Sequence, residues 1–309
     1  MKIALIVITI FLFIYLFISY IAFILICRKF NNYPIKTISK NITEALAPYQ
    51  KLIEKGQKWV SNKNKEDIYI KSFDNLKLHG ILIEKNNPKG IFIEVHGYRS
   101  EPTRDIYPSC YHYYNMGYNL LLVDQRTAGQ SAGKYLTFGI NESKDLYNWV
   151  KYINKKYPDL PIVLAGVSMG ASTAMMSASL FNKSNNIKAI LADSGFVSPI
   201  EEISYCIKHY FHVPPISLIN MINIWCLLLG KFNLKSKNTI DCLNNNDIPL
   251  LLVHGEDDDF IPILNSKNNY EQYNGSKKEF VTFPKAYHGM GYLVDPKRYV
   301  DVIKSFIKE

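Results

Sequence analysis

The sequence predicts an α/β domain with a mostly parallel central sheet, helices on both faces and a small helical cap, preceded by one membrane-spanning helix. Short apolar runs recur along the chain with amphipathic helical patterns between them, which is typical of a parallel sheet with helical crossovers. A third observation, an uncharged stretch from Ile3 to Cys27, predicts the amino-terminal helix. The 309 residues leave room for one sizeable core and little for a second large domain.

Composition excludes several classes of protein. Hydrophobic residues make up 48% of the chain and charged residues 20%, which excludes wholesale disorder. The net charge of +9 is compatible with an anionic lipid surface or with nucleic acid, and it carries no information about the fold. The five cysteines are widely spaced and include no C-x-x-C pair, which argues against a disulfide framework or a zinc module.

Residues 1–30 are predicted to be a membrane anchor. At 1.5 Å per residue, the uncharged stretch can cross a hydrocarbon core of about 30 Å with some tilt. The alternatives are a buried core helix, which rarely runs this long without a polar face, and a cleaved signal peptide. The apolar run ends in Cys27-Arg28-Lys29-Phe30, which is a poor cleavage site. We therefore expect an uncleaved single span in the cell membrane.

The side of the membrane that holds the body of the protein is left open by the sequence. Lys2 lies before the span, whereas four basic residues follow it, and this excess favours a cytoplasmic body. Those residues are Arg28, Lys29, Lys36 and Lys40. Residues 31–67 are expected to form a juxtamembrane linker with one helix around Thr43–Lys55, and its basic residues could rest on lipid headgroups.

The α/β domain is expected to span residues 68–309. A hairpin is predicted around Asp74-Asn75, followed by a series of buried strands. The predicted strands are Ile68–Ser72, Leu76–Glu84, Gly90–Val95, Tyr118–Asp124, Pro161–Val167, Ile187–Asp193, Ile248–His254 and Lys278–Phe283.

Helices are predicted between these strands. An amphipathic stripe runs from Leu146 to Tyr157, a small apolar helix covers Ala171–Phe181, and a closing helix contains Tyr299–Ile307. The alternation breaks at residues 194–246, which show helical stretches and no strand, so we expect this segment to be a cap inserted into the domain. Tyrosines 111, 113 and 114 fall at helical spacing, which core packing explains at least as well as base stacking does.

The sharpest chemical signal is Gly166-Val167-Ser168-Met169-Gly170. It matches G-x-S-x-G and lies after a predicted strand and before a predicted helix, where a serine projects from a sharp turn at the carboxyl edge of the sheet. The positive end of the following helix favours developing negative charge. Ser168 is therefore the candidate nucleophile.

A serine hydroxyl needs a base, and the base needs an orienting acid. In a fold with this turn the expected chain order is Ser, then Asp or Glu, then His. His288 follows the last predicted strand and is the candidate base. The candidate acids lie together from Glu256 to Asp259, and spacing alone does not choose among them.

Attack on an acyl carbonyl also needs two backbone N–H donors for the oxyanion. One is expected from Met169, directly after the nucleophile, and the other from Tyr98, in the loop after the third strand. Gly97 permits the tight bend in that loop, and we expect the neighbouring His96 to be structural.

From about Ile68 onward, the sequence resembles the α/β-hydrolase superfamily. Within it, the chain looks similar to bacterial membrane-anchored serine hydrolases related to the prolyl-oligopeptidase-like and BEM46-like members. The resemblance places the acid of the family pattern H-G-x-x-D-x-x-V-P at Asp258, with Ile261 in place of Val. It also maps the family pattern D-x-R-G/A-x-G-x-S-x-G onto residues 124–133, with Ala128 where relatives commonly have His.

The expected function is therefore that of a membrane-tethered serine hydrolase, a carboxylesterase that uses Ser168, Asp258 and His288 without a cofactor or metal. The apolar cap and the anchor suggest small-molecule or lipid-like acyl esters as substrates, and we expect no nucleic-acid partner. Serine peptidase and acyltransferase chemistry on the same fold are alternatives, and so is a non-catalytic, membrane-anchored binding module.

Overall fold

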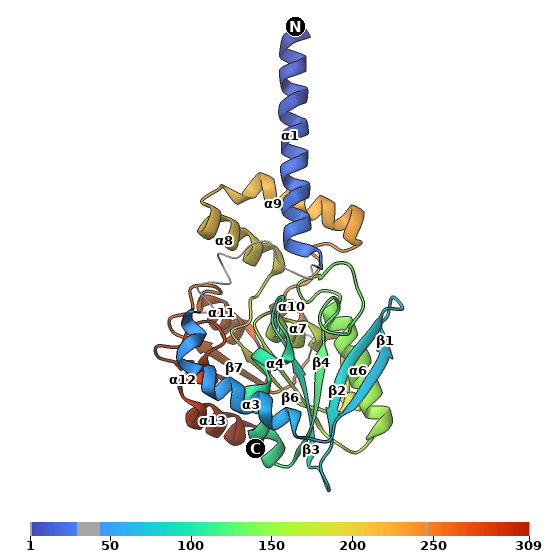
Figure 1. Ribbon diagram of the computed structural model, residues 1–309, viewed down its shortest axis with the longest axis vertical. Helices are drawn as coiled ribbons and strands as arrows, with labels where there is room; N and C mark the ends of the chain where they lie inside the picture. Colours follow the sequence, from blue (N-terminus) through green and yellow to red (C-terminus); the bar gives the residue numbers. More distant parts are fainter. Residues whose placement is uncertain (1, 30–43, 245, 309) are drawn as a thin grey trace.

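The computed structural model describes residues 2–29, 44–244 and 246–308. Its first helix, α1 (Lys2–Cys27), projects from the body of the molecule as a long rod (Figure 1). By length and composition α1 can cross a membrane, a property that signal sequences share. Most of α1 is exposed, unlike a buried core helix. The predicted linker residues 31–43, with Lys36 and Lys40, lie outside the described residues.

The body is built on one eight-stranded sheet with the order β1-β2-β4-β3-β5-β6-β7-β8. β1 and β2 form an antiparallel hairpin, β2 pairs antiparallel with β4, and the remaining neighbours are parallel. This confirms the predicted mostly parallel sheet. The strands are β1 Glu66–Lys71, β2 Lys77–Ile83, β3 Gly90–Val95, β4 Tyr118–Asp124, β5 Ile162–Val167, β6 Ile187–Asp193, β7 Leu250–Gly255 and β8 Lys278–Phe283.

Helices cover both faces of the sheet, as predicted, because the apolar strands bury side chains on each side. One face packs against α3 (Gln50–Ser61), α5 (Tyr107–Asn115) and α13 (Pro296–Lys308). The other packs against α6 (Glu142–Lys156) and α7 (Met169–Ser177). Further helices in the described part of the body are α4 Pro102–Asp105, α11 Leu264–Gln272 and α12 Gly291–Val294, with short turns η1 Ala47–Tyr49, η2 Ala178–Leu180 and η3 Lys183–Asn185.

The helix expected around Thr43–Lys55 is present over the described residues and extends to Ser61, with a short 3-10 turn inside it. The turn η1 contains Pro48, and α3 begins after it at Gln50, because proline is tolerated only in the first turn of a helix. Ile53 and Val60 of α3 are buried in the core beside the sheet. The expected linker segment thus contributes a packed helix to the body. Trp59 of α3 also contacts the ring of Tyr111, so this tyrosine packs against protein.

The cap lies over the carboxyl edge of the sheet, below the projecting part of α1 (Figure 1). It consists of α8 (Pro199–Phe211), α9 (Pro215–Trp225) and the π-helical turn η4 (Cys226–Gly230). α10 (Thr239–Leu243), at the end of the predicted insertion, packs against α7 of the body (Figure 1). Phe23 and Cys27 of α1 are fully buried in one cluster with cap residues such as Ile222 and Cys226. The carboxyl half of α1 is therefore packed against the cap, which the sequence did not predict.

Candidate active site

Ser168 occupies a sharp turn between β5 and α7. Its φ of 58° lies in the left-handed region, which is uncommon for a residue with a side chain. The turn fits because glycines stand two residues before and two residues after the serine. A Cβ atom on Gly170 would lie 2.0 Å from the Val95 carbonyl oxygen, and one on Gly166 would lie 2.4 Å from the Gly170 carbonyl carbon. The G-x-S-x-G spacing thus lets β3, β5 and α7 meet behind the serine.

The structure brings the three predicted side chains into one hydrogen-bonded line. Nε2 of His288 lies 2.8 Å from Oγ of Ser168, and Nδ1 of the same ring lies 2.8 Å from Oδ2 of Asp258. Ser168 follows β5, Asp258 follows β7, and His288 follows β8. The carboxyl ends of these parallel strands lie at one edge of the sheet, so residues up to 120 positions apart meet there.

Among the four neighbouring acids, Asp258 is the one in contact with His288. Its side chain has no exposed surface, whereas Glu256, Asp257 and Asp259 are exposed. The other oxygen of Asp258 accepts hydrogen bonds from the backbone N–H groups of Phe260 and Ile261, at 3.0 and 2.9 Å. The turn after β7 therefore fixes one carboxylate and leaves the other three in water.

A second histidine contacts the same carboxylate, and the sequence did not indicate it. Nε2 of His254 lies 3.1 Å from Oδ2 of Asp258, and Nδ1 of His254 lies 2.7 Å from Oγ of Ser266. His254 is fully buried at the end of β7, four residues before the acid. The sequence signal from which this contact could have been predicted is the H-G-x-x-D pattern, in which His254 is the first residue and Asp258 the last.

Electrostatics at this site favour a charged carboxylate and a basic imidazole. Burial alone would raise the pKa of Asp258, but the two histidines and their hydrogen bonds outweigh burial and hold it well below its usual range. Burial likewise lowers the pKa of His288, and the charge of Asp258 outweighs that effect, so the net shift is upward. His288 is thus a stronger proton acceptor than an ordinary histidine.

The two predicted oxyanion donors lie in segments that border Ser168. Met169 begins α7 and is buried, and a Cβ atom on Gly97 would lie 3.2 Å from Cβ of Ser168, so the loop that carries Tyr98 abuts the serine. The Gly97 N–H donates to Asp105 at 2.8 Å, which fixes the bend. The side chain of Tyr98 points to α1, where its hydroxyl donates to the Ile26 carbonyl at 2.8 Å.

His96 is held within the protein scaffold. Its Nδ1 donates to the Gly97 carbonyl at 2.9 Å, and its Nε2 accepts from the Gln125 N–H at 3.1 Å. Burial lowers its pKa, which keeps the ring neutral. Both ring nitrogens have backbone partners, in agreement with the structural role expected from the sequence.

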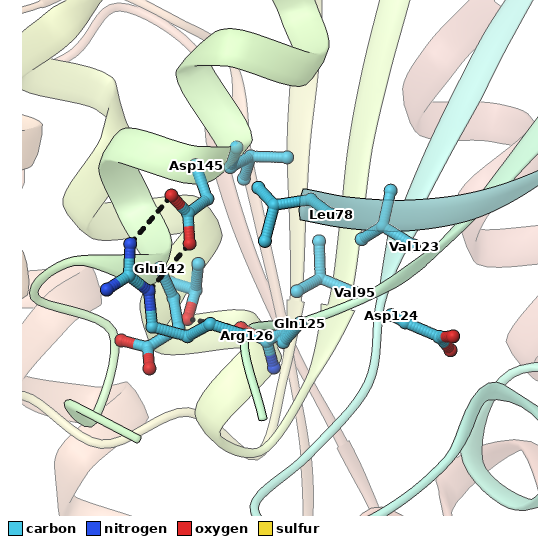
Figure 2. A pocket seen from close by; sticks show the side chains of 10 residues that line it. Leu78, Val95, Val123, Asp124, Gln125, Arg126, Glu142 and Asp145 are labelled. Atoms are coloured by element: carbon cyan, nitrogen blue, oxygen red, sulfur yellow. Dashed lines mark hydrogen bonds and ion pairs between the residues drawn. The ribbon is translucent and has the colours of Figure 1, made fainter. Parts of the chain in front are cut away.

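The segment 124–129 at the end of β4 also belongs to the structural scaffold. Arg126 makes a two-pronged ion pair with Asp145 of α6, at 2.7 and 2.8 Å (Figure 2). The cavity beside this pair has a volume of about 10 Å³, room for about one water molecule and no substrate. Gly129 adopts a φ of 46°, and a Cβ atom there would lie 2.0 Å from Oδ2 of Asp124. This loop needs glycine for packing.

The cap supplies one acidic group that the sequence did not single out. Glu202 of α8 is buried, and burial raises its pKa to about 7. Its carboxyl accepts a hydrogen bond from Sγ of Cys206 at 3.3 Å, and its charge acts on that of His288.

Among the described residues, no group of three or more His, Cys, Asp or Glu side chains is arranged to hold a metal ion.

Comparisons with known proteins agree with this architecture. A family model described as serine aminopeptidase, S33, matches residues 86–212. The chain is 26% identical over 194 residues to the uncharacterized protein YqkD of Bacillus subtilis, and this match spans 63% of YqkD, under two thirds of its length. It is also 26% identical over 179 residues to human protein ABHD12B, across 55% of this chain and 47% of that protein.

Solved structures show the same fold. The Pyrococcus furiosus esterase Pf2001 superposes with a TM-score of 0.65 at 26% identity, covering 80% of this chain and 91% of the esterase. Est1E of Butyrivibrio proteoclasticus, solved with ferulic acid, gives a TM-score of 0.59 at 22% identity, across 78% of this chain and 96% of Est1E, which shows the fold alone. The finer similarity to membrane-anchored BEM46-like members stays a prediction. By its sheet order and by these matches, the chain has the α/β-hydrolase fold and is similar to hydrolases of that superfamily.

Proposed function

We propose that this chain is a membrane-anchored serine hydrolase that cleaves carboxylic esters through an acyl-enzyme intermediate. The observation that carries the proposal is the hydrogen-bonded line from Ser168 through His288 to Asp258. This arrangement supplies a nucleophile, a base and an orienting acid in the required order. The similarity to the Pyrococcus esterase supports esters as the substrate class.

In the proposed reaction, Oγ of Ser168 attacks the acyl carbonyl while Nε2 of His288 accepts the hydroxyl proton. Asp258 stabilises the imidazolium that forms, and His288 then donates the proton to the departing alcohol oxygen. Water attacks the acyl-enzyme in the same way, with His288 again taking and returning the proton, and this releases the acid. The backbone N–H groups of Met169 and Tyr98 are the proposed donors to the oxyanion.

The anchor in this proposal is α1, which has no charged residue between Lys2 and Arg28. Arg28 and Lys29, on the body side, favour a cytoplasmic catalytic domain. A peptidase is the second candidate, because the matching family model is described as a serine aminopeptidase and because a serine acyl-enzyme can form from an amide as well as from an ester.

Covalent labelling with a fluorophosphonate tests the serine mechanism. We expect the full-length protein to react and the Ser168→Ala variant to remain unlabelled. Ser179→Ala is the matched control, because Ser179 lies in η2, just beyond the far end of α7, and should leave labelling intact. An unlabelled wild-type protein that is also inert toward short p-nitrophenyl esters would refute the proposal. Faster turnover of aminoacyl anilides than of matched esters would favour the peptidase.

A further inference from the structure

The cap carries exposed apolar side chains from the end of α8 through α9 to η4. Pro215–Gly230 forms a continuous apolar helical segment, and Ile216 and Leu228 are 76% and 65% exposed. We define the cap apolar surface as Phe211, Val213, Ile216, Leu227, Leu228 and Leu229, all of which are exposed. A group of large exposed apolar side chains of this kind marks a contact with a membrane or a partner.

This surface lies beside the helix that is proposed to enter the membrane. The hydroxyl of Tyr15 donates to the Ser217 carbonyl at 2.7 Å, and the indole N–H of Trp225 donates to Oγ of Ser19 at 3.0 Å. The rings of Tyr20 and Trp225 are in edge contact, with centroids 5.4 Å apart. Figure 1 shows α9 crossing α1 partway along its length, with the rest of α1 extending beyond the cap.

The length of α1 determines how deep in the bilayer its contact with α9 would lie. All residues from Lys2 to Ile14 are exposed, and cover by the cap begins at Tyr15. These 13 residues extend about 20 Å beyond the cap, whereas the hydrocarbon core is about 30 Å thick. If α1 spans the bilayer, the remaining distance of about 10 Å must include the part of α1 that contacts α9. The cap would then lie within the near leaflet.

The charged residues around the cap apolar surface agree with a position in the near leaflet. No acidic residue occurs between Ile203 and Ile240, and the charged residues of that segment are lysines, including Lys208 and Lys231 on either side of the cap apolar surface. Arg28 at the end of α1 is also exposed. Basic side chains that flank an apolar helix suit the headgroup layer of an anionic leaflet.

We propose that the cap apolar surface is embedded in the leaflet next to the catalytic body, and that the site takes acyl esters from that leaflet. The second part rests on the proposed function. A chain of aromatic contacts leads from the surface to the site: Tyr210, next to Phe211, contacts the ring of Phe260, which contacts the ring of His288. The substrate class that fits is an amphiphile with its ester near the headgroup layer.

The embedding is tested on full-length protein in vesicles of phosphatidylcholine and phosphatidylglycerol. A Leu228→Cys variant is labelled with an environment-sensitive fluorophore in a Cys206→Ser background, because the other four cysteines are buried. Phe73→Cys, exposed on the β1–β2 hairpin, is the matched control. We expect quenching of the label at position 228 by nitroxide groups on the acyl chains, and quenching of the label at position 73 by aqueous iodide.

Iodide quenching at position 228 would overturn the embedding. Shielding from both quenchers would also overturn it, because it would indicate that a second copy of the chain covers the surface. For substrate delivery, we expect Leu227→Glu/Leu228→Glu to lower the ratio of vesicle-ester to soluble-ester hydrolysis about tenfold or more. An unchanged ratio would refute delivery from the leaflet. If the proposed function failed, fluorophosphonate labelling and both hydrolysis rates would be absent, whereas the fluorescence result would stand.

Discussion

At the scale of single residues, Asp258 is held between two imidazoles, with His254 at 3.1 Å and His288 at 2.8 Å. Its charge raises the pKa of His288, which must be neutral to accept the proton of Ser168. Activity is therefore expected to be lost as the pH falls through a value above the usual histidine pKa of about 6.5.

Replacing this acid tests the assignment. Asp258→Asn should lower kcat by about three to four orders of magnitude and move the acid limb of the pH profile to lower pH, because the imidazole loses its charged partner. The profile of kcat/KM against pH measures both effects. Asp257→Asn changes an exposed neighbour and is the matched control. A comparable loss in Asp257→Asn, or an unshifted limb in Asp258→Asn, would contradict the assignment.

Glu94 is a second residue with a strongly shifted pKa. It lies on β3, and burial raises its pKa to about 8, while its Oε1 has no hydrogen-bond partner among the described residues. The folded protein thus holds a proton at Glu94 that the unfolded chain releases above about pH 4.5. Stability should fall by about 1 kcal/mol per pH unit between these two pKa values.

Glu94→Gln should remove this dependence, because the amide does not ionise. We expect the variant to gain stability over wild type progressively from about pH 5 to about pH 8, as measured by urea unfolding in detergent at several pH values. Glu84→Gln, on a more exposed glutamate after β2, should leave the slope unchanged. A difference between wild type and Glu94→Gln that does not vary with pH would show that Glu94 is ionised in the folded protein.

At the scale of elements, the end of α1 is tied to the loop that borders Ser168. Nη2 of Arg99 donates to the Leu25 and Arg28 carbonyls at 2.9 and 2.8 Å, at the carboxyl end of α1. The adjacent Tyr98 donates to Ile26. The position of the anchor helix and that of the proposed oxyanion loop are therefore linked.

Arg99→Ala should weaken this link. Loss of its hydrogen bonds should lower the free energy of unfolding by about 1–3 kcal/mol and reduce kcat more than it changes KM, because the Tyr98 backbone would be less well placed. Thermal unfolding in detergent and ester kinetics measure the two effects. Arg99→Lys keeps the positive charge but lacks the planar set of N–H donors. Its stability and its kcat should therefore lie between those of wild type and those of Arg99→Ala. If Arg99→Ala lost stability with unchanged kcat, the loop would be independent of α1.

At the scale of the whole molecule, α1 serves both as a proposed anchor and as part of the fold. Its carboxyl half buries Phe23 and Cys27 in the same cluster as Phe138, Met169 and Ile222. Met169 directly follows the candidate nucleophile. Removing α1 would therefore uncover apolar surface beside the site as well as detach the protein from a membrane.

Two truncations separate these roles. Deletion of residues 2–14 removes only the exposed part of α1 and should release the protein from membranes with little change in unfolding temperature. Deletion of residues 2–43 should lower the unfolding temperature and cause aggregation without detergent, because the cluster around Ile222 loses its partners. Fractionation and calorimetry test both. Equal stability of the two truncations would show that α1 contributes nothing to the body.

Much of this organisation could be predicted from local pattern. Continuous apolar runs gave the order of the eight strands in the chain to within about two residues, since a strand buried on both faces has few alternatives. The turn at Ser168 was predictable because glycines are needed on both sides of it. By contrast, the burial of Ile53 in α3 and the contact of His254 with Asp258 depend on partners distant in the chain or on the local turn geometry.

The amino-acid pattern alone established an apolar helix long enough to span a bilayer, an alternating α/β body and the candidates Ser168 and His288. These follow from periodicity and short motifs, which act over a few residues. Spacing left four adjacent acids open and the family resemblance indicated Asp258, but only the tertiary structure put Asp258 against His288 and packed α1 against the cap. These outcomes depend on which side chains lose contact with water when distant segments pack together, and no local pattern carries that information.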